Sequence, residues 1–215
     1  MWSQTFILAD RIKATLLAWT AGLVVAATAA DQVPFSNATI SNATIMPLSI
    51  LGIVAQTYIV TAALRIGLDA DAQAAIRPRF ARVFWISFVT TLAIALGGLL
   101  LIIPGVFLLI RWWIAVPIAL DRDMDVSESM RESWKLIAAH WAAILGMFLV
   151  LLAIFVIPLI GLFFFGGFDD GTISVPMSLA INIVMHGVLN LGTVSTVAAY
   201  RTIYQPVTQL RQVFE

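Results

Sequence analysis

The chain has 215 residues, of which 61% are hydrophobic and only 11% are charged. Soluble domains are about a quarter charged, so this composition excludes an ordinary soluble core and predicts an integral membrane protein. The net charge of zero argues against a nucleic-acid partner. The absence of cysteine excludes disulfides, thiolate metal sites and a cysteine nucleophile.

Six apolar stretches follow one another along the chain, and each approaches or exceeds the ~17–25 residues that a membrane-spanning helix needs. They predict an all-α fold, a polytopic bundle of six transmembrane helices in a single membrane domain, residues 1–215. The fourth stretch is the shortest and needs help from its flanks or local thinning of the bilayer. Pro104-Gly105 is expected to form an outer turn before it. The expected spans are residues 14–30, 45–64, 84–103, 106–120, 142–165 and 175–200.

The lysines and arginines predict the orientation of these spans. All but one of the 12 fall in segments that six crossings would place on one side of the membrane. The opposite loops, residues 31–44, 104–105 and 166–174, contain none. Loops rich in Lys and Arg stay in the cytoplasm, so both termini are predicted to be cytoplasmic.

A signal peptide is the alternative reading of the first span. Lys13, an apolar run and Ala27-Thr28-Ala29 resemble a leader with a cleavage site, and cleavage would leave five spans. Residues 2–10 make a poor basic leader because they contain Asp10 and no cation. The favoured prediction is therefore an uncleaved anchor, preceded by a short amphipathic helix.

Residues 125–141 predict an additional helix on the inner membrane surface. Met130, Trp134, Ile137 and Trp141 recur at helical spacing and form one apolar face. The segment is either a dock for lipid or for a partner protein, or simply an amphipathic connector, which is the favoured reading.

The cations beside this surface are candidate lipid contacts. Three arginines before the third span, Arg77, Arg79 and Arg82, would each attract anionic lipid by ~1 kcal/mol. Trp134 and Lys135 of the surface helix complete this candidate set. The arginines also serve as topology determinants, and the two readings are compatible.

A polar row runs along the sixth span. Ser178, Asn182, His186 and Asn190 are spaced by four residues, so they lie on one face of the helix. Such residues normally bond neighbouring helices, which is the favoured interpretation. The alternative is a polar pathway or a small internal site. No metal site is predicted, because His140 is the only other histidine.

Arg111 is the one cation inside a predicted span. Six residues below the expected outer turn, it would lie ~9 Å deep, where insertion of a charge costs ~2.5–3.5 kcal/mol. No Asp or Glu lies within the six predicted spans. Its partners are therefore outer headgroups, amide and backbone oxygens, or a lipid phosphate. We predict a polar intramembrane cluster that comprises Arg111, Asn182, His186, Asn190 and Gln56.

Several of these features together resemble a known family. Ile103-Pro104-Gly105, Arg111, Pro117, Asp121 and the sequence ESMRESWKLIAAHW are similar, in order and spacing, to a pattern in the six-helix membrane domain of bacterial glycerophosphoryl diester phosphodiesterases and its stand-alone relatives. In fused members the hydrolase is a separate soluble domain, which is not expected here. The resemblance thus implies a protein of the bacterial inner membrane, without catalytic activity or cofactor, linked to handling of envelope lipids.

Two functions remain open at this stage. The favoured one is a non-catalytic membrane protein that interacts with lipids, including anionic phospholipid, or that organises the envelope. The alternative is a small transporter or permease subunit that uses the polar cluster. A homo-oligomer or a partner membrane protein is compatible with both. An intramembrane enzyme is disfavoured, because no Gly-x-Ser-x-Gly or His-Glu-x-x-His sequence is present.

Overall fold

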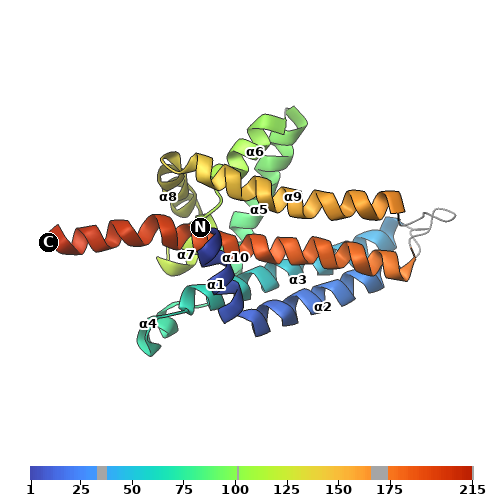
Figure 1. The fold of residues 1–215 in the computed structure, drawn as a ribbon, viewed down its shortest axis with the longest axis horizontal. Coiled ribbons are helices and arrows are strands. Elements are labelled where there is room, and N and C mark those ends of the chain that lie inside the picture. The colour runs from blue at the N-terminus through green and yellow to red at the C-terminus, as the bar shows by residue number, and fades with distance from the viewer. Residues whose placement is uncertain (33–37, 101, 166–173, 215) are drawn as a thin grey trace.

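The computed structural model describes residues 1–32, 38–100, 102–165 and 174–214, and every regular element in these ranges is a helix (Figure 1). Five segments are long and apolar enough to cross a membrane, and Phe80–Ile94 is a shorter apolar helix. The all-α, multi-helix prediction is thus confirmed. The helices are α1 (Trp2–Arg11), α2 (Lys13–Asp31), α3 (Ala38–Arg65), α4 (Ala70–Ala75), α5 (Phe80–Leu100), α6 (Ile102–Arg111), α7 (Ala115–Asp121), α8 (Val126–Ala138), α9 (Trp141–Phe165) and α10 (Val175–Phe214).

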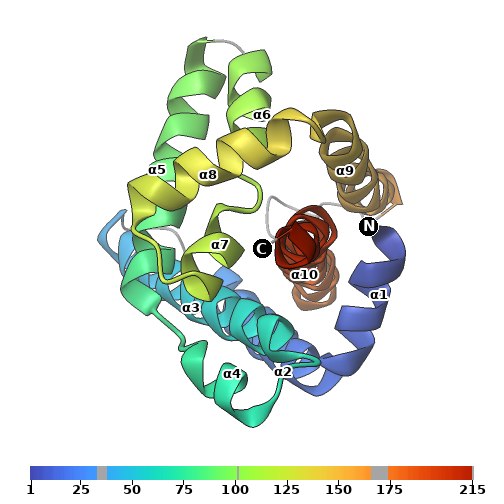
Figure 2. The same cartoon turned by 90° about the vertical axis from the view of Figure 1, so that its left-hand side faces the viewer.

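Helix α10 is the central element of the bundle. Figure 2 shows it end-on, with α1, α2, α3, α7 and α9 around it. Its buried face is rich in small and β-branched residues, among them Val194, Val197 and Ala198, which are all fully buried. Small side chains let helices approach closely in a membrane, where packing rather than the hydrophobic effect drives association.

The outer surface of the bundle is apolar. Helix α9 illustrates this best, because its most apolar window has a mean hydropathy of 3.0 and is only 17% buried. Ile157 and Phe164 are 67% and 74% exposed. A surface of this kind is stable in contact with lipid, which solvates apolar side chains.

The α5–α6 hairpin differs from the prediction. Helix α5 ends at Leu100 and α6 begins at Ile102, so Pro104-Gly105 lies in the first turn of α6 and is not the predicted outer turn. Proline is tolerated there because the first N–H groups of a helix have no intrahelical acceptor. The two helices pack along each other and lean away from the long axis of the bundle in both views (Figures 1 and 2).

The predicted fourth span is interrupted. Helix α6 ends at Arg111 and α7 begins only at Ala115. Between them, the backbone N–H groups of Trp113 and Ala115 donate to carbonyls three residues earlier, at 3.2 and 3.1 Å. Pro117 explains the interruption, because it has no N–H to donate to the carbonyl of Trp113 and its ring would clash with that group. This break shapes the candidate site.

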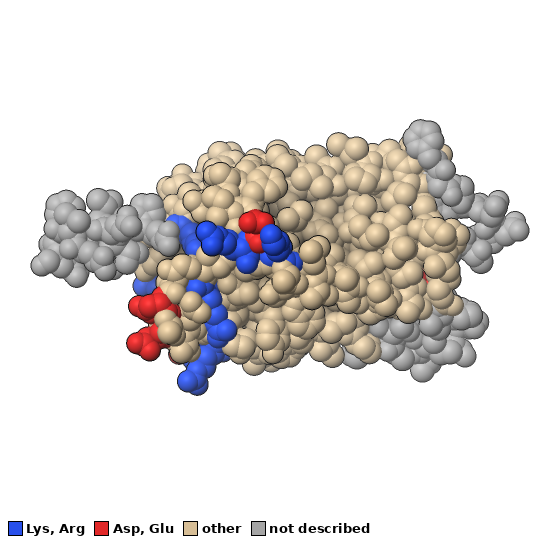
Figure 3. All heavy atoms as spheres, turned by 60° about the horizontal axis from the view of Figure 1, so that its bottom comes forward, with Lys and Arg blue, Asp and Glu red and all other residues tan. Residues whose placement is uncertain are grey.

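Charged residues gather at one end of the bundle. On the face drawn in Figure 3, the Lys and Arg side chains and most acidic ones lie in the half that carries α4 and α8, whereas the other half is almost free of charge. The predicted surface helix is α8, which buries Met130 and Ile137 against the protein and leaves Trp134 37% exposed.

Candidate functional site

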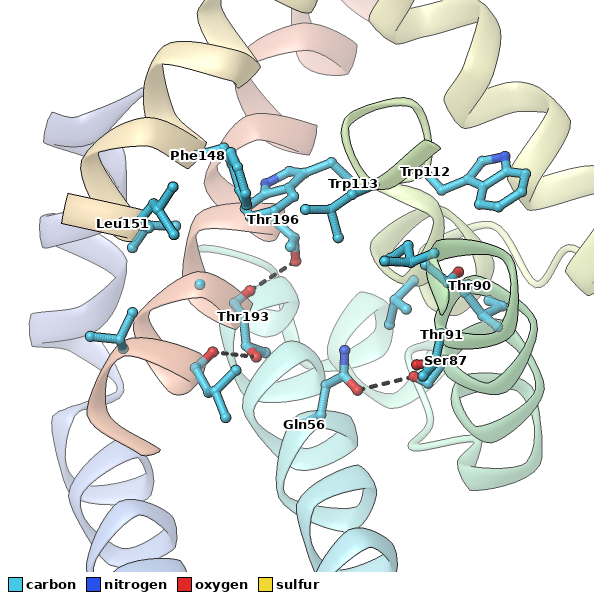
Figure 4. Close-up of a pocket in the computed structure, with 18 of the residues that line it drawn as sticks. Gln56, Ser87, Thr90, Thr91, Trp112, Trp113, Phe148, Leu151, Thr193 and Thr196 are labelled. Atoms are coloured by element: carbon cyan, nitrogen blue, oxygen red, sulfur yellow. Dashed lines mark hydrogen bonds between the residues drawn. The ribbon is translucent and has the colours of Figure 1, made fainter. Parts of the chain in front are cut away.

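A cavity of about 490 Å³ lies between α3, α5, α9, α10 and the α6–α7 break (Figure 4). Its volume is in the range of small-molecule sites, about 300–1,000 Å³. The residues that line it are Gln56, Ile86, Ser87, Thr90, Thr91, Ile94, Leu109, Trp112, Trp113, Val116, Phe148, Leu151, Leu152, Phe155, Val188, Leu189, Gly192, Thr193 and Thr196.

The α6–α7 break provides the aromatic wall of the cavity. Trp112 and Trp113 lie in the interrupted segment, where the chain leaves the helical path. The ring of Trp113 packs edge-on against that of Phe148, with 6.1 Å between the ring centroids. A continuous helix would direct these tryptophans differently, so the cavity depends on the interruption between Arg111 and Ala115.

The cavity opens toward the outer surface of the bundle. Three of its lining residues are exposed at that surface: Thr91 of α5, Leu152 of α9 and Leu189 of α10. None of the described residues that line it is charged. The opening therefore joins an apolar space to the part of the surface that is suited to lipid.

Several polar groups in the cavity have partners within the protein, and others do not. The Ser87 hydroxyl donates to Oε1 of Gln56 at 3.2 Å. The hydroxyls of Thr193 and Thr196 donate to backbone carbonyls of their own helix, at 3.0 and 2.8 Å. In contrast, Thr90 Oγ1 and Trp113 Nε1 are buried without a hydrogen-bond partner among the described residues.

Arg111 does not join the predicted intramembrane cluster. Its guanidinium donates to the backbone carbonyl of Trp134 at 3.2 Å and lies over the rings of Phe107 and Trp134, at 5.1 and 5.0 Å. The Ser133 hydroxyl in turn donates to the carbonyl of Arg111 at 2.9 Å. The prediction was wrong because α6 ends at Arg111, next to α8, so the arginine fastens α6 to the surface helix.

Arg111 also points away from the cavity. At 100° per residue, it lies 200° around α6 from Leu109, which lines the cavity. The two side chains therefore project from opposite faces of α6.

The polar row of α10 joins α10 to α2. Asn182 Nδ2 donates to Oδ2 of Asp31 at 2.9 Å, and the Ser178 hydroxyl donates to the same oxygen at 2.6 Å. Farther along, Asn190 Nδ2 donates to the hydroxyl of Thr20 at 2.8 Å. These bonds agree with the favoured reading of the row as helix–helix adhesion.

Asp31 is the partner of this row that was not predicted from the sequence, because Asp31 was expected to lie in the outer loop. A signal was present: Thr20, Thr28 and Asp31 fall within an arc of about 80° on α2, at 100° per residue. The residues of this arc face the polar row of α10. His186, the remaining member of the row, is half-buried and makes no hydrogen bond to a described residue.

Two of the predicted lipid contacts are engaged within the protein. Arg79 and Arg82 both pair with the carboxylate of Asp123, in the loop after α7. Asp123 has φ of 55°, the left-handed region that Asp tolerates better than most residues. Arg77 and Lys135 make no side-chain hydrogen bond or ion pair to a described residue.

The segment of α10 around Tyr200 and Arg201 is held by a further polar cluster. The Tyr200 hydroxyl donates to Asp121 at the end of α7. Arg201 donates to the carbonyls of Leu64 and Ile66, both at 2.8 Å, and so ties α10 to the end of α3. Among the described residues, no three His, Cys, Asp or Glu side chains are grouped in a way that could hold a metal ion.

The fold and the cavity define a multi-pass α-helical membrane protein with a lateral apolar site. A segment of 63 residues is 40% identical to the UPF0259 membrane protein SG1383 of Sodalis glossinidius, covering 29% of this chain and 25% of that protein. The chain therefore spans about a quarter of that bacterial relative. No protein-family profile and no solved structure matches the chain. The resemblance to the phosphodiesterase membrane domain stays a prediction.

Proposed function

We propose that the protein is a non-catalytic protein of the bacterial inner membrane that binds a membrane lipid in the cavity between α5, α9 and α10. The observation that carries this proposal is the lateral opening of an uncharged, largely apolar cavity at Thr91, Leu152 and Leu189. In a bilayer, the molecules next to such an opening are lipids.

Lipid is a better occupant of this cavity than water. A buried water needs two to four polar partners, whereas the lining is largely apolar and four of its polar groups, on Gln56, Ser87, Thr193 and Thr196, already bond within the protein. An empty cavity forfeits the dispersion contacts of its lining, which a flexible hydrocarbon chain restores. Both arguments favour occupation by a largely apolar part of a lipid.

The proposed topology has six spans and both termini in the cytoplasm. It takes α5 and the α6–α7 segment as the third and fourth spans. Support comes from the cations at the end of α3 and around α4, α5 and α8, which lie at one end of the bundle (Figure 3). Arg77 and Lys135, without protein partners among the described residues, are the proposed contacts with anionic headgroups.

The alternative of a small transporter has less support. A pathway along α10 would need polar groups that are free to bind a substrate, whereas Ser178, Asn182 and Asn190 bond residues of α2. The cavity is lined by other residues of α10, so the row and the cavity are separate features.

Filling the cavity tests the proposal. A Cβ at Gly192, which lines the cavity, would meet only Leu151 Cδ1 at 3.9 Å, so Gly192→Phe introduces a large side chain at the cavity wall without a clash at its Cβ. Gly187→Phe is the matched control, because Gly187 also lies on α10 with nothing within 4 Å of a Cβ, and it does not line the cavity.

Lipid that co-purifies with the protein would be counted by native mass spectrometry in a mild detergent. We expect the wild type and Gly187→Phe to retain at least one lipid per chain, and Gly192→Phe to lose most of it. Equal retention by the two variants would contradict the proposal.

A further inference from the structure

The cavity contains polar groups that bond nothing in the protein, and they are all donors or can act as donors. Gln56 uses its Oε1 to accept from Ser87, while its Nε2 has no partner among the described residues. Figure 4 shows this amide extending from α3 into the space between α10 and α5. Trp113 Nε1 is a donor only, and the Thr90 hydroxyl can donate. An occupant that satisfies these groups must supply acceptors.

The occupant must also be uncharged. No described lining residue is ionisable at neutral pH, and Arg111 projects from the opposite face of α6. An ion without a partner in such surroundings has a large desolvation cost. A phosphate group is therefore excluded from the cavity itself.

The depth of Gln56 limits the position of the acceptor. Gln56 lies nine residues before Arg65, where α3 ends, which is ~13–14 Å along the helix. Half of the hydrocarbon core is ~15 Å thick, so the Gln56 amide lies near the middle of the bilayer. The ester carbonyls of glycerolipids lie at the boundary of the hydrocarbon and do not reach this depth.

We infer that the cavity binds the head of an isoprenoid quinone. This inference specifies the ligand of the lipid-binding function proposed above and rests on that function. A quinone ring carries two carbonyl acceptors and has neither a donor nor a charge, and its isoprenoid tail keeps it inside the hydrocarbon. One carbonyl oxygen accepts from Gln56 Nε2. The flat ring suits a cavity with Trp113 and Phe148 in its wall.

The test uses the full chain in detergent micelles with decylubiquinone as the probe and native mass spectrometry of the one-to-one complex as the readout. Gln56→Leu replaces the amide with an apolar side chain of similar size and so removes the donor. Loss of one hydrogen bond of about 0.5–1.5 kcal/mol corresponds to an affinity about 2- to 12-fold lower. Thr193→Val is the matched control, because the Thr193 hydroxyl lines the cavity but already bonds Leu189.

We expect the wild type and Thr193→Val to bind the quinone within twofold of each other, and Gln56→Leu to bind it more weakly. Decylbenzene, which has a comparable tail and ring but no carbonyl, should bind the wild type and Gln56→Leu equally. Unchanged quinone affinity in Gln56→Leu, or no quinone complex, would overturn this inference. If Gly192→Phe still removed co-purified lipid in that case, the lipid-binding function would stand. Failure of both the quinone test and the lipid-retention test would contradict both proposals.

Discussion

The amide nitrogen of Asn182 in α10 lies 2.9 Å from the carboxylate oxygen Oδ2 of Asp31, at the end of α2. The two residues are 151 positions apart in the chain, and Ser178 donates to the same oxygen. This contact fixes the first membrane helix against the last one. It also makes Asp31 part of the bundle, although the sequence places it at the edge of a loop.

The contact between Asp31 and Asn182 should contribute measurably to stability. We expect Asp31→Ala and Asn182→Ala each to destabilise the protein, with a coupling energy of about 0.6–1.7 kcal/mol, the range of interhelical hydrogen bonds in membranes. A double-mutant cycle on the free energy of unfolding in mixed micelles measures this coupling. The pair Asp31 and Asn190 provides the control, because Asn190 bonds Thr20, and its coupling to Asp31 should be close to zero.

Arg111 should stabilise the packing of α8 against α6, and not a contact between membrane-spanning helices. Arg111→Leu removes a hydrogen bond and two contacts with aromatic faces, so we expect a loss of about 1–2 kcal/mol in the free energy of unfolding. Arg111→Lys should restore only part of this, because an ammonium lacks the planar fork of donors. Faster tryptic cleavage at Arg131 and Lys135 of α8 would report its release. Arg77→Leu removes a cation without a described partner and should leave both readouts unchanged.

The effects of Arg111 and Asn182 should be independent of each other. The two residues share no hydrogen-bond partner in the described part of the chain, since one contacts α8 and the other α2. The double variant Arg111→Leu/Asn182→Leu should therefore lose stability additively, within about 0.5 kcal/mol. A larger deviation would restore the single polar cluster that the sequence suggested.

Asp123 should control how much of the basic surface is available to lipid. The substitution Asp123→Asn is compatible with the left-handed backbone at this position, because Asn adopts it as readily as Asp. It removes the carboxylate charge that pairs with Arg79 and Arg82. Each freed cation would attract anionic lipid by about 1 kcal/mol, so retained phosphatidylglycerol should rise relative to phosphatidylethanolamine in native mass spectra. Asp71→Asn, which changes the net charge equally without breaking an ion pair to a described residue, should produce a smaller rise.

The absence of cysteine makes the topology straightforward to test. Single cysteines at Gln32 and at Asp71, both exposed, mark opposite ends of the bundle. In intact bacterial spheroplasts, a membrane-impermeant maleimide should label Gln32→Cys, whereas Asp71→Cys should react only after permeabilisation. The reverse pattern would contradict the proposed orientation of α2 and α3.

Much of the helical framework could be predicted from the chain alone. The apolar segments around residues 14–30, 142–165 and 175–200 correspond to α2, α9 and α10, because length and hydropathy are properties of a continuous segment. The grouping of cations at one end could also be predicted, because it follows from which connecting segments contain Lys and Arg. However, the positions of the cations require only that the α5–α6 pair starts and ends on the same side of the membrane. They contain no information on how this hairpin leans relative to the bundle.

The partners of the polar residues depended on the tertiary structure. Whether Arg111 meets Asn182 or Trp134 is set by where α6 ends and which of its faces meets α8, and Pro117 displaces the chain at that point. The cavity arises in the same way, since residues from five separated segments line it and no single segment encodes it. Composition and periodicity determined that these helices lie in a membrane, whereas the contacts between helix faces decided which side chains lie together, because each such contact joins residues distant in the chain.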